Sequence, residues 1–152
     1  MIPDPTFIMF GKLLLAAFLG AVIGTERAVI ARQPAGMRTF ALVTLGACTF
    51  VVAGAYVDAF AVGLSNFDPM RIAAGIVMGV GFIGGGVMFQ RGDGIHGITT
   101  AAGLWVAAAI GVLVGFGLYS LAIFASALTL LIFFGMWYLE HRFIDWYHRE
   151  ND

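Results

Sequence analysis

The ionisable residues that could do chemistry in this chain fall at the edges of long apolar segments. Glu26, Arg27 and Arg38 form one group, because the first two close an apolar segment and Arg38 opens the next. Charges near a membrane are rarely isolated, so this spacing predicts a Glu26–Arg27 or a Glu26–Arg38 ion pair. The alternative is that the arginines only anchor the segment ends on the cytoplasmic side.

A second group, Asp58, Asp68 and Arg71, borders the apolar segments at their other edge. One or two carboxylates with several water molecules make a magnesium site, so Asp58 and Asp68 are candidate ligands for Mg²⁺. Asp58 could instead be solvated, or it could pair with Lys12 or Arg71. Mg²⁺ is the only ion that these residues suggest, and we expect no other cofactor.

Side chains that enzymes use occur here without the spacing that catalysis needs. Cys48 lies in an apolar run, and His96, His141 and His148 show no ligand spacing with carboxylates or cysteine. The glycines after Gly81 lack the strand and the Lys–Ser/Thr sequence of a phosphate-binding loop. No nucleophile stands beside a base, so we predict that the protein is not an enzyme. An enzyme acting on lipid headgroups is a minor alternative.

Small residues recur at four-residue spacing, which lets membrane helices approach closely. They predict a compact bundle, although an exposed series would serve a dimer interface equally well. Close packing does not require three consecutive glycines such as Gly84, Gly85 and Gly86. They predict a kink or an unwound helix end, because each glycine weakens a helix by about 1 kcal/mol. The series are Ala16, Gly20 and Gly24; Gly75 and Gly79; Gly81 and Gly85; and Gly103, Ala107, Gly111 and Gly115.

The elements that must position these residues follow from the composition. Of 152 residues, 61% are hydrophobic and 11% are charged, whereas a soluble domain carries about 25% charged residues. The chain is therefore a membrane protein in contact with the lipid bilayer, and a soluble helical protein with a very apolar core is the alternative. The net charge of −1 and the lack of a basic, aromatic-rich patch argue against a nucleic-acid partner.

About 20 helical residues cross the hydrocarbon layer of a bilayer, and five segments satisfy this length. Asp68 and Pro69 are a cap and a helix-starting proline for the third segment, and Thr99 or Thr100 could cap the fourth. A retained first helix is preferred to a cleaved signal, because no basic cluster precedes it. We predict an all-α polytopic membrane protein with helices at about 7–28, 39–61, 69–90, 99–116 and 118–138.

Residues 139–152 form a charged tail after the fifth segment. Leu139, Phe143, Trp146 and Tyr147 recur at helical spacing within it. Aromatic residues at such spacing favour a short amphipathic helix at the membrane interface, on the cytoplasmic side. A frayed polar tail is the alternative.

The orientation of the chain follows from its lysines and arginines, which are enriched in cytoplasmic loops. Six fall on the side of the C-terminus and two on the side of the N-terminus, so we predict an external N-terminus and a cytoplasmic C-terminus. The six are Arg27, Arg32, Arg38, Arg91, Arg142 and Arg149, and the two are Lys12 and Arg71.

Three stretches together resemble the MgtC/SapB family of bacterial membrane proteins. They read GAVIGTERAVIARQPAGMRT, DPMRIAAGIVMGVGFIGGGVM and GITTAAGLWVAAAIG, and the resemblance extends from about Leu13 to Gly115. The motif positions carried over are Glu26, Arg27, Gly36, Arg38, Thr39, Asp68, Pro69, Arg71, Gly81, Gly84, Gly86, Gly97, Thr99, Thr100 and Trp105.

The resemblance implies about five membrane helices in the bacterial inner membrane and a link to magnesium limitation and stress adaptation. Virulence members of the family support survival inside host cells and are thought to act on partners such as the ATP synthase. They are not established as simple magnesium pumps. The longer members carry a soluble domain after the fifth helix, and its roles are not carried over to this sequence, which reads to Asp152. Gly84–Gly86 stands where the family often has alanine between two glycines.

Two functions are consistent with these observations. Five helices are few for a monomeric transporter, so either function favours a homodimer. The first is a protein of magnesium homeostasis that binds and modulates another membrane complex. The second is a transporter or channel for a small ion or solute. Its polar route would use a cytoplasmic-side cluster of Glu26, Arg27, Arg38, Thr39, Thr99 and Thr100, near Trp105, with the glycines Gly81, Gly84, Gly85, Gly86, Gly103 and Gly111 bringing the helices together.

Overall fold

The computed structural model of the chain describes residues 5–33, 35–60, 68–91 and 94–151, without the side chains of Pro5, Phe60, Arg91, Trp137 and 139–151. Its five helices are all long and apolar enough to cross a membrane. The protein is therefore an all-α polytopic membrane protein, as the sequence predicts. The elements are α1 (Pro5–Val29), α2 (Met37–Phe60), α3 (Pro69–Val87), β1 (Phe89–Arg91), β2 (Gly94–His96), α4 (Ile98–Gly115) and α5 (Tyr119–Asn151).

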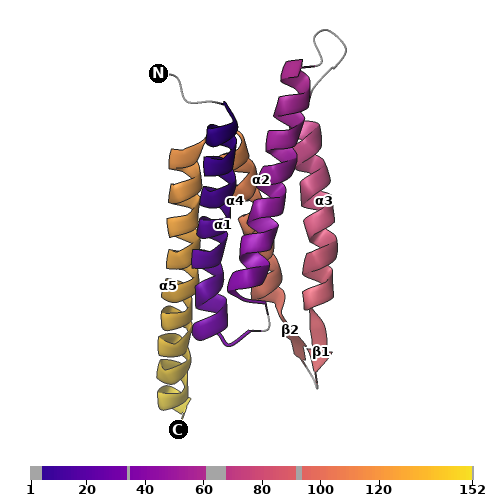
Figure 1. Cartoon of the computed structure of the whole chain (residues 1–152). Coiled ribbons are helices and arrows are strands. Elements are labelled where there is room, and N and C mark those ends of the chain that lie inside the picture. The colour runs from indigo at the N-terminus through magenta and orange to yellow at the C-terminus, as the bar shows by residue number, and fades with distance from the viewer. Residues whose placement is uncertain (1–4, 34, 61–67, 92–93, 152) are drawn as a thin grey trace.

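The predicted helix ends differ from the observed ones by more than two residues in two places. α3 ends at Val87, short of the predicted 90, because Met88 has an extended backbone and leads into β1. α5 continues without a break to Asn151, so the predicted amphipathic tail is its C-terminal part. Figure 1 shows this part extending past the end of α1. Its predicted aromatic spacing falls on side chains that lie outside the described residues.

A short β-hairpin joins α3 to α4, and the sequence did not predict it. β1 and β2 pair antiparallel, with Phe89 opposite His96 and Arg91 opposite Gly94. The Phe89 and His96 rings stack with centroids 5.7 Å apart. Strands of three residues are too short for an alternating pattern to show in the sequence.

The starts of α3 and α4 are built differently. Asp68 caps α3 by accepting a hydrogen bond from the backbone N–H of Met70, and Pro69 follows it, as predicted. The predicted cap of α4 by Thr99 or Thr100 is wrong, because Gly97 is the capping residue. Its φ of 89° lies in the left-handed region, and an added Cβ would overlap the Val87 carbonyl oxygen. The turn from the hairpin into α4 therefore requires glycine.

α4 is the central helix of the bundle. It runs behind α1 and α2 in Figure 1 and contacts α1, α2, α3 and α5. Half of the α4 span is buried (50%), compared with 11% of the α3 span. The two chain ends lie at opposite ends of the bundle, as an odd number of spans requires.

Small residues bring α1 and α4 onto α2. A Cβ added at Gly20 would lie 2.6 Å from the Phe40 carbonyl oxygen, so α1 and α2 touch through their backbones there. A Cβ added at Gly111 would overlap the Thr44 carbonyl oxygen and lie 2.9 Å from the Ala47 Cβ. The small series of α4 is thus used inside the bundle, and it is not an exposed surface for dimerisation.

The glycines of α3 have a different environment. Gly81, Gly85 and Gly86 have no atom within 4 Å of an added Cβ, so the expectation that they pack helices together is not met within this chain. Gly84 is the exception, because an added Cβ would lie 3.6 Å from the Ala101 Cβ of α4. Gly84–Gly86 remain helical as far as Val87, without the predicted kink or unwound end.

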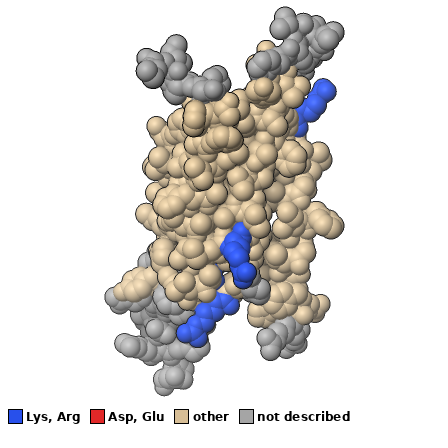
Figure 2. All heavy atoms as spheres, viewed as in Figure 1, with Lys and Arg blue, Asp and Glu red and all other residues tan. Residues whose placement is uncertain are grey.

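The surface between the two ends of the bundle is apolar. On the face shown in Figure 2, basic side chains lie near the upper end and in the lower half, and no acidic side chain is visible. Large apolar side chains are exposed all round, including Phe82 at 86% and Met78 at 73%. Such exposure is what lipid contact requires of a membrane-spanning helix.

Candidate functional site

A buried ion pair marks one end of the bundle. Glu26 and Arg27, in the last turn of α1, are 2% and 6% exposed, and the Arg27 Nε donates to the Glu26 carboxylate. The Arg27 guanidinium carbon lies 4.0 Å above the centre of the Phe133 ring of α5. Because buried charges are costly unless paired, the carboxylate and the ring together explain how Arg27 is accommodated.

The other predicted members of the cytoplasmic-side cluster are not drawn into this pair. Of the two predicted pairings, the structure forms Glu26–Arg27, and Arg38 is exposed in the first turn of α2. Thr39 is partly buried beside it, and Thr99 is exposed. Trp105 is 51% exposed on α4, which places it at the bundle surface. Apart from Thr100, the predicted cluster therefore divides into a buried pair and residues that are exposed or partly buried.

Thr100, the remaining member, lines a small pocket at the same end of the bundle. The pocket holds about 220 Å³, and Thr100 is 3% exposed. Three segments enclose it: the loop before α2, the end of α3 with β1, and the start of α4. Its lining residues are Gln33, Ala35, Gly86, Val87, Phe89, Gly97 and Thr100.

The chemistry that this pocket offers is neutral. It contains one hydroxyl, one amide side chain and the backbone near Gly97, and no charged side chain is among its lining residues. The Gln33 amide nitrogen donates to the Ala31 carbonyl oxygen at 3.3 Å, so part of its hydrogen-bonding capacity is used within its own loop. Such a pocket suits a small neutral polar group better than a bare cation, because Mg²⁺ prefers carboxylate oxygens.

The predicted outer-side cluster lies at the opposite end of the bundle. Asp68 serves as the cap of α3, Arg71 is exposed in its first turn, and Asp58 is partly buried near the end of α2. The Nζ of Lys12 donates to the Gly115 carbonyl oxygen at 2.8 Å. The pairing of Asp58 with Lys12 or Arg71 stays a prediction. No group of three potential metal ligands occurs among the described residues. Magnesium binding by Asp58 and Asp68 stays a prediction.

Comparison with known proteins decides the family of this chain. The MgtC family model matches residues 13–142. The chain belongs to the MgtC family. Within it, the family motif positions Gly86, Gly97 and Thr100 line one pocket, while Asp68 and Pro69 begin α3.

Several curated relatives of this MgtC-family chain span greater lengths. A protein of Escherichia coli (strain K12) described as "Putative magnesium transporter YhiD" is 43% identical over 123 residues, covering 80% of this chain and 57% of the relative. "Protein MgtC" of Brucella abortus (strain 2308) is 44% identical over 117 residues, covering 77% and 46%. "Protein MgtC" of Salmonella typhimurium (strain 14028s) is 44% identical over 119 residues, covering 78% and 48%. No solved structure matches the chain significantly.

The chain thus spans about half the length of the curated relatives it matches. Together with the five apolar helices, the family supports a bacterial membrane protein. The activities of the longer relatives cannot be assigned to this chain from the match, because the match leaves much of each relative uncovered.

Sequence reasoning missed two contacts that shape the ends of this MgtC-family bundle. Phe133 of α5 supports Arg27, and Lys12 of α1 binds the end of α4. Each lies far along the chain from its partner, so no local spacing could reveal the contact. Lys12 carried one usable signal, because a lone lysine in an apolar segment implies a specific polar partner.

Proposed function

We propose that this protein takes part in magnesium homeostasis and stress adaptation in the bacterial inner membrane by binding and modulating membrane partners. The observation that carries the proposal is the exposed glycine-containing side of α3. Its residues Ala74, Met78, Gly81, Phe82 and Gly85, here called the outer face of α3, are all exposed. Gly81 and Gly85 have no atom within 4 Å of an added Cβ.

The outer face of α3 suits a partner helix better than it suits lipid alone. Apolar burial gives no reward between helices in lipid, so close backbone approach at small residues is what favours association. The equivalent glycine series of α4 is already used against α2, whereas the outer face of α3 has no neighbour among the described residues. A helix of another membrane protein or of a second copy would fit it, and the second case makes the protein a homodimer.

The core supports partner binding over transport through a single chain. Side chains such as Ile23, Phe40, Leu104 and Ile110 are fully buried and fill the space around α4. The buried Glu26–Arg27 pair lies at one end of the bundle, away from the middle. We propose that this end is cytoplasmic and that the N-terminus is external, since most lysines and arginines lie on this side.

Leucine at Gly81 and Gly85 together tests this proposal. We expect the double variant to lose self-association in membranes, measured by energy transfer between labelled copies, and to fail to support growth at limiting magnesium. The matched control is leucine at Gly75 and Gly79, which are also open glycines of α3 but lie outside the outer face. A double variant that folds, associates and supports growth like the control contradicts the proposal.

A transporter or channel is the second candidate function. The small pocket lined by Gln33 and Thr100 is consistent with a neutral solute, whereas the name of the Escherichia coli relative, a "Putative magnesium transporter", suggests magnesium. Reconstituted vesicles loaded with a magnesium indicator test it directly. Flux above that of empty vesicles would support transport, and its absence in vesicles that contain folded protein would exclude magnesium as the substrate.

A further inference from the structure

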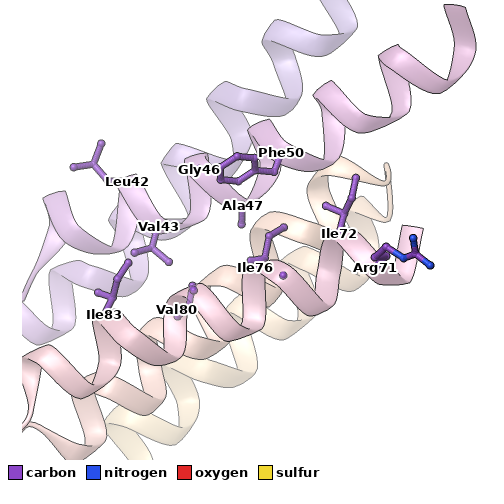
Figure 3. A pocket seen from close by; sticks show the side chains of 12 residues that line it. Leu42, Val43, Gly46, Ala47, Phe50, Arg71, Ile72, Ile76, Val80 and Ile83 are labelled. Carbon is purple, nitrogen blue, oxygen red and sulfur yellow. The ribbon is translucent and has the colours of Figure 1, made fainter. Parts of the chain in front are cut away.

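An apolar groove between α2 and α3 has no role in the function proposed above. It holds about 600 Å³, within the roughly 300–1,000 Å³ of ligand-binding pockets. Figure 3 shows Val43 and Ala47 of α2 pointing toward α3, where Ile83 and Ile76 line the other side. The groove lies along the helices, so its length runs in the direction that a lipid chain takes in a bilayer.

Glycines create the space of the groove. Gly46 of α2 and Gly75 and Gly79 of α3 line it, and each has no atom within 4 Å of an added Cβ. α2 and α3 therefore do not close on each other along this stretch, although close approach is the usual result of glycines at a helix interface. An apolar molecule in the space between them would be stabilised, because the lining side chains would make van der Waals contacts with it that an unfilled space does not provide.

Arg71 supplies charge at one end of the groove. It is the only charged residue in the lining, and it lies beyond Ile72 at the end formed by the first turn of α3. Arg71 is exposed, and the ion pair that the structure shows among the described residues is Glu26–Arg27 at the other end of the bundle. The groove is thus apolar along its length and cationic at its mouth.

We propose that this groove binds one phospholipid with an anionic headgroup. One acyl chain lies between α2 and α3 over Gly46, Gly75 and Gly79, and the phosphate binds the Arg71 guanidinium. Arginine matches phosphate geometry with paired hydrogen bonds, and lipid supplies both the charge and the chain that the groove requires. A second copy fits less well, because two parallel α3 helices at this groove would bring two Arg71 side chains to the same end.

Native mass spectrometry of the full chain in detergent, titrated with phosphatidylglycerol or phosphatidylcholine, tests the proposal. We expect the wild type to bind one phosphatidylglycerol more tightly than phosphatidylcholine, because the choline cation of the latter offsets the attraction of its phosphate to Arg71. Gly75→Leu with Gly79→Leu should lose the phosphatidylglycerol because the leucines fill the groove. Arg71→Gln is expected to weaken phosphatidylglycerol binding about tenfold, the equivalent of one charge-assisted hydrogen bond, while Arg71→Lys retains more of it. Leucine at Gly81 and Gly85 is the matched control and should bind lipid as the wild type does.

Three results would overturn the proposal. The first is equal phosphatidylglycerol binding by the wild type and the groove-filled variant. The second is loss of dimer from the groove-filled variant with no bound lipid in the wild type, which would assign the groove to a second copy. The third is unchanged binding by Arg71→Gln. This variant leaves the apolar part of the groove unfilled, so it stays informative if the leucine variant fails to fold.

Discussion

Single glycines in this chain have opposite roles that depend on their neighbours. Gly111 lies against the backbone of α2, whereas Gly81 faces open space on α3. From the sequence, leucine at Gly111 is a natural test of association with a partner protein, because Gly111 belongs to a series of small residues. In the structure it would damage the bundle itself, so a loss of association there says nothing about an interface.

Gly111→Leu is therefore predicted to destabilise the fold. Its side chain would have to enter space held by the Thr44 carbonyl and the Ala47 Cβ, and overpacking of this kind costs about 3 kcal/mol. Unfolding of the purified protein in detergent measures the loss. Gly81→Leu is the control and should change the unfolding free energy little, whereas equal effects at the two positions would contradict this packing.

The buried pair of Glu26 and Arg27 predicts strong coupling. Arg27→Gln leaves the Glu26 carboxylate buried without its partner, which costs about 3–5 kcal/mol. Changing both residues to Gln should cost less than the two single changes added together, since neither charge then remains. A double-mutant cycle of unfolding free energies measures this difference, and simple additivity would show that the pair is not coupled.

At the scale of elements, the turn between α4 and α5 is also the place where α1 is bonded to the end of α4. Gly117, with a φ of 80°, ends α4, and the N–H groups of Gly117 and Leu118 bond to the carbonyls of Val114 and Leu113 at 2.9 Å. This is the Schellman arrangement of a helix end. Lys12 of α1 adds a cation at the same end by donating to the Gly115 carbonyl.

Lys12→Met should loosen this end of the bundle. It removes a cation from the negative end of the α4 dipole and one hydrogen bond, which together contribute about 1 kcal/mol in a partly buried setting. The midpoint of thermal unfolding in detergent should fall by a few degrees. Arg32→Gln, at an exposed position, is the control, and a loss of the same size there would point to a general effect of charge.

At the scale of the whole molecule, the orientation in the membrane follows from charge. Six of the eight lysines and arginines lie on the side of the C-terminus, and cytoplasmic loops carry such an excess. We expect a fluorescent protein that folds only in the cytoplasm to fluoresce when fused after Asp152. The same protein fused before Met1 should stay dark, and the reverse pattern would show that the proposed orientation is wrong.

Much of the fold could be predicted from local patterns, and most of the site could not. The spans of α1, α2 and α4 follow from runs of apolar residues, and Asp68 with Pro69 marked the start of α3 because capping is a local interaction. The cap of α4 was assigned wrongly to Thr99 or Thr100. Its actual cap, Gly97, is required by the approach of Val87, which belongs to a different element.

The amino-acid sequence by itself determined that this chain enters a membrane as five helices with unequal charge at their two ends, because hydropathy and charge act on each segment alone. Only the tertiary structure decided which glycines are used. It buried the series of α4 against α2 and left those of α3 open, at the outer face and in the groove beside Arg71. A glycine has no side chain to show which neighbour it meets, so only the arrangement of the helices can assign it a partner.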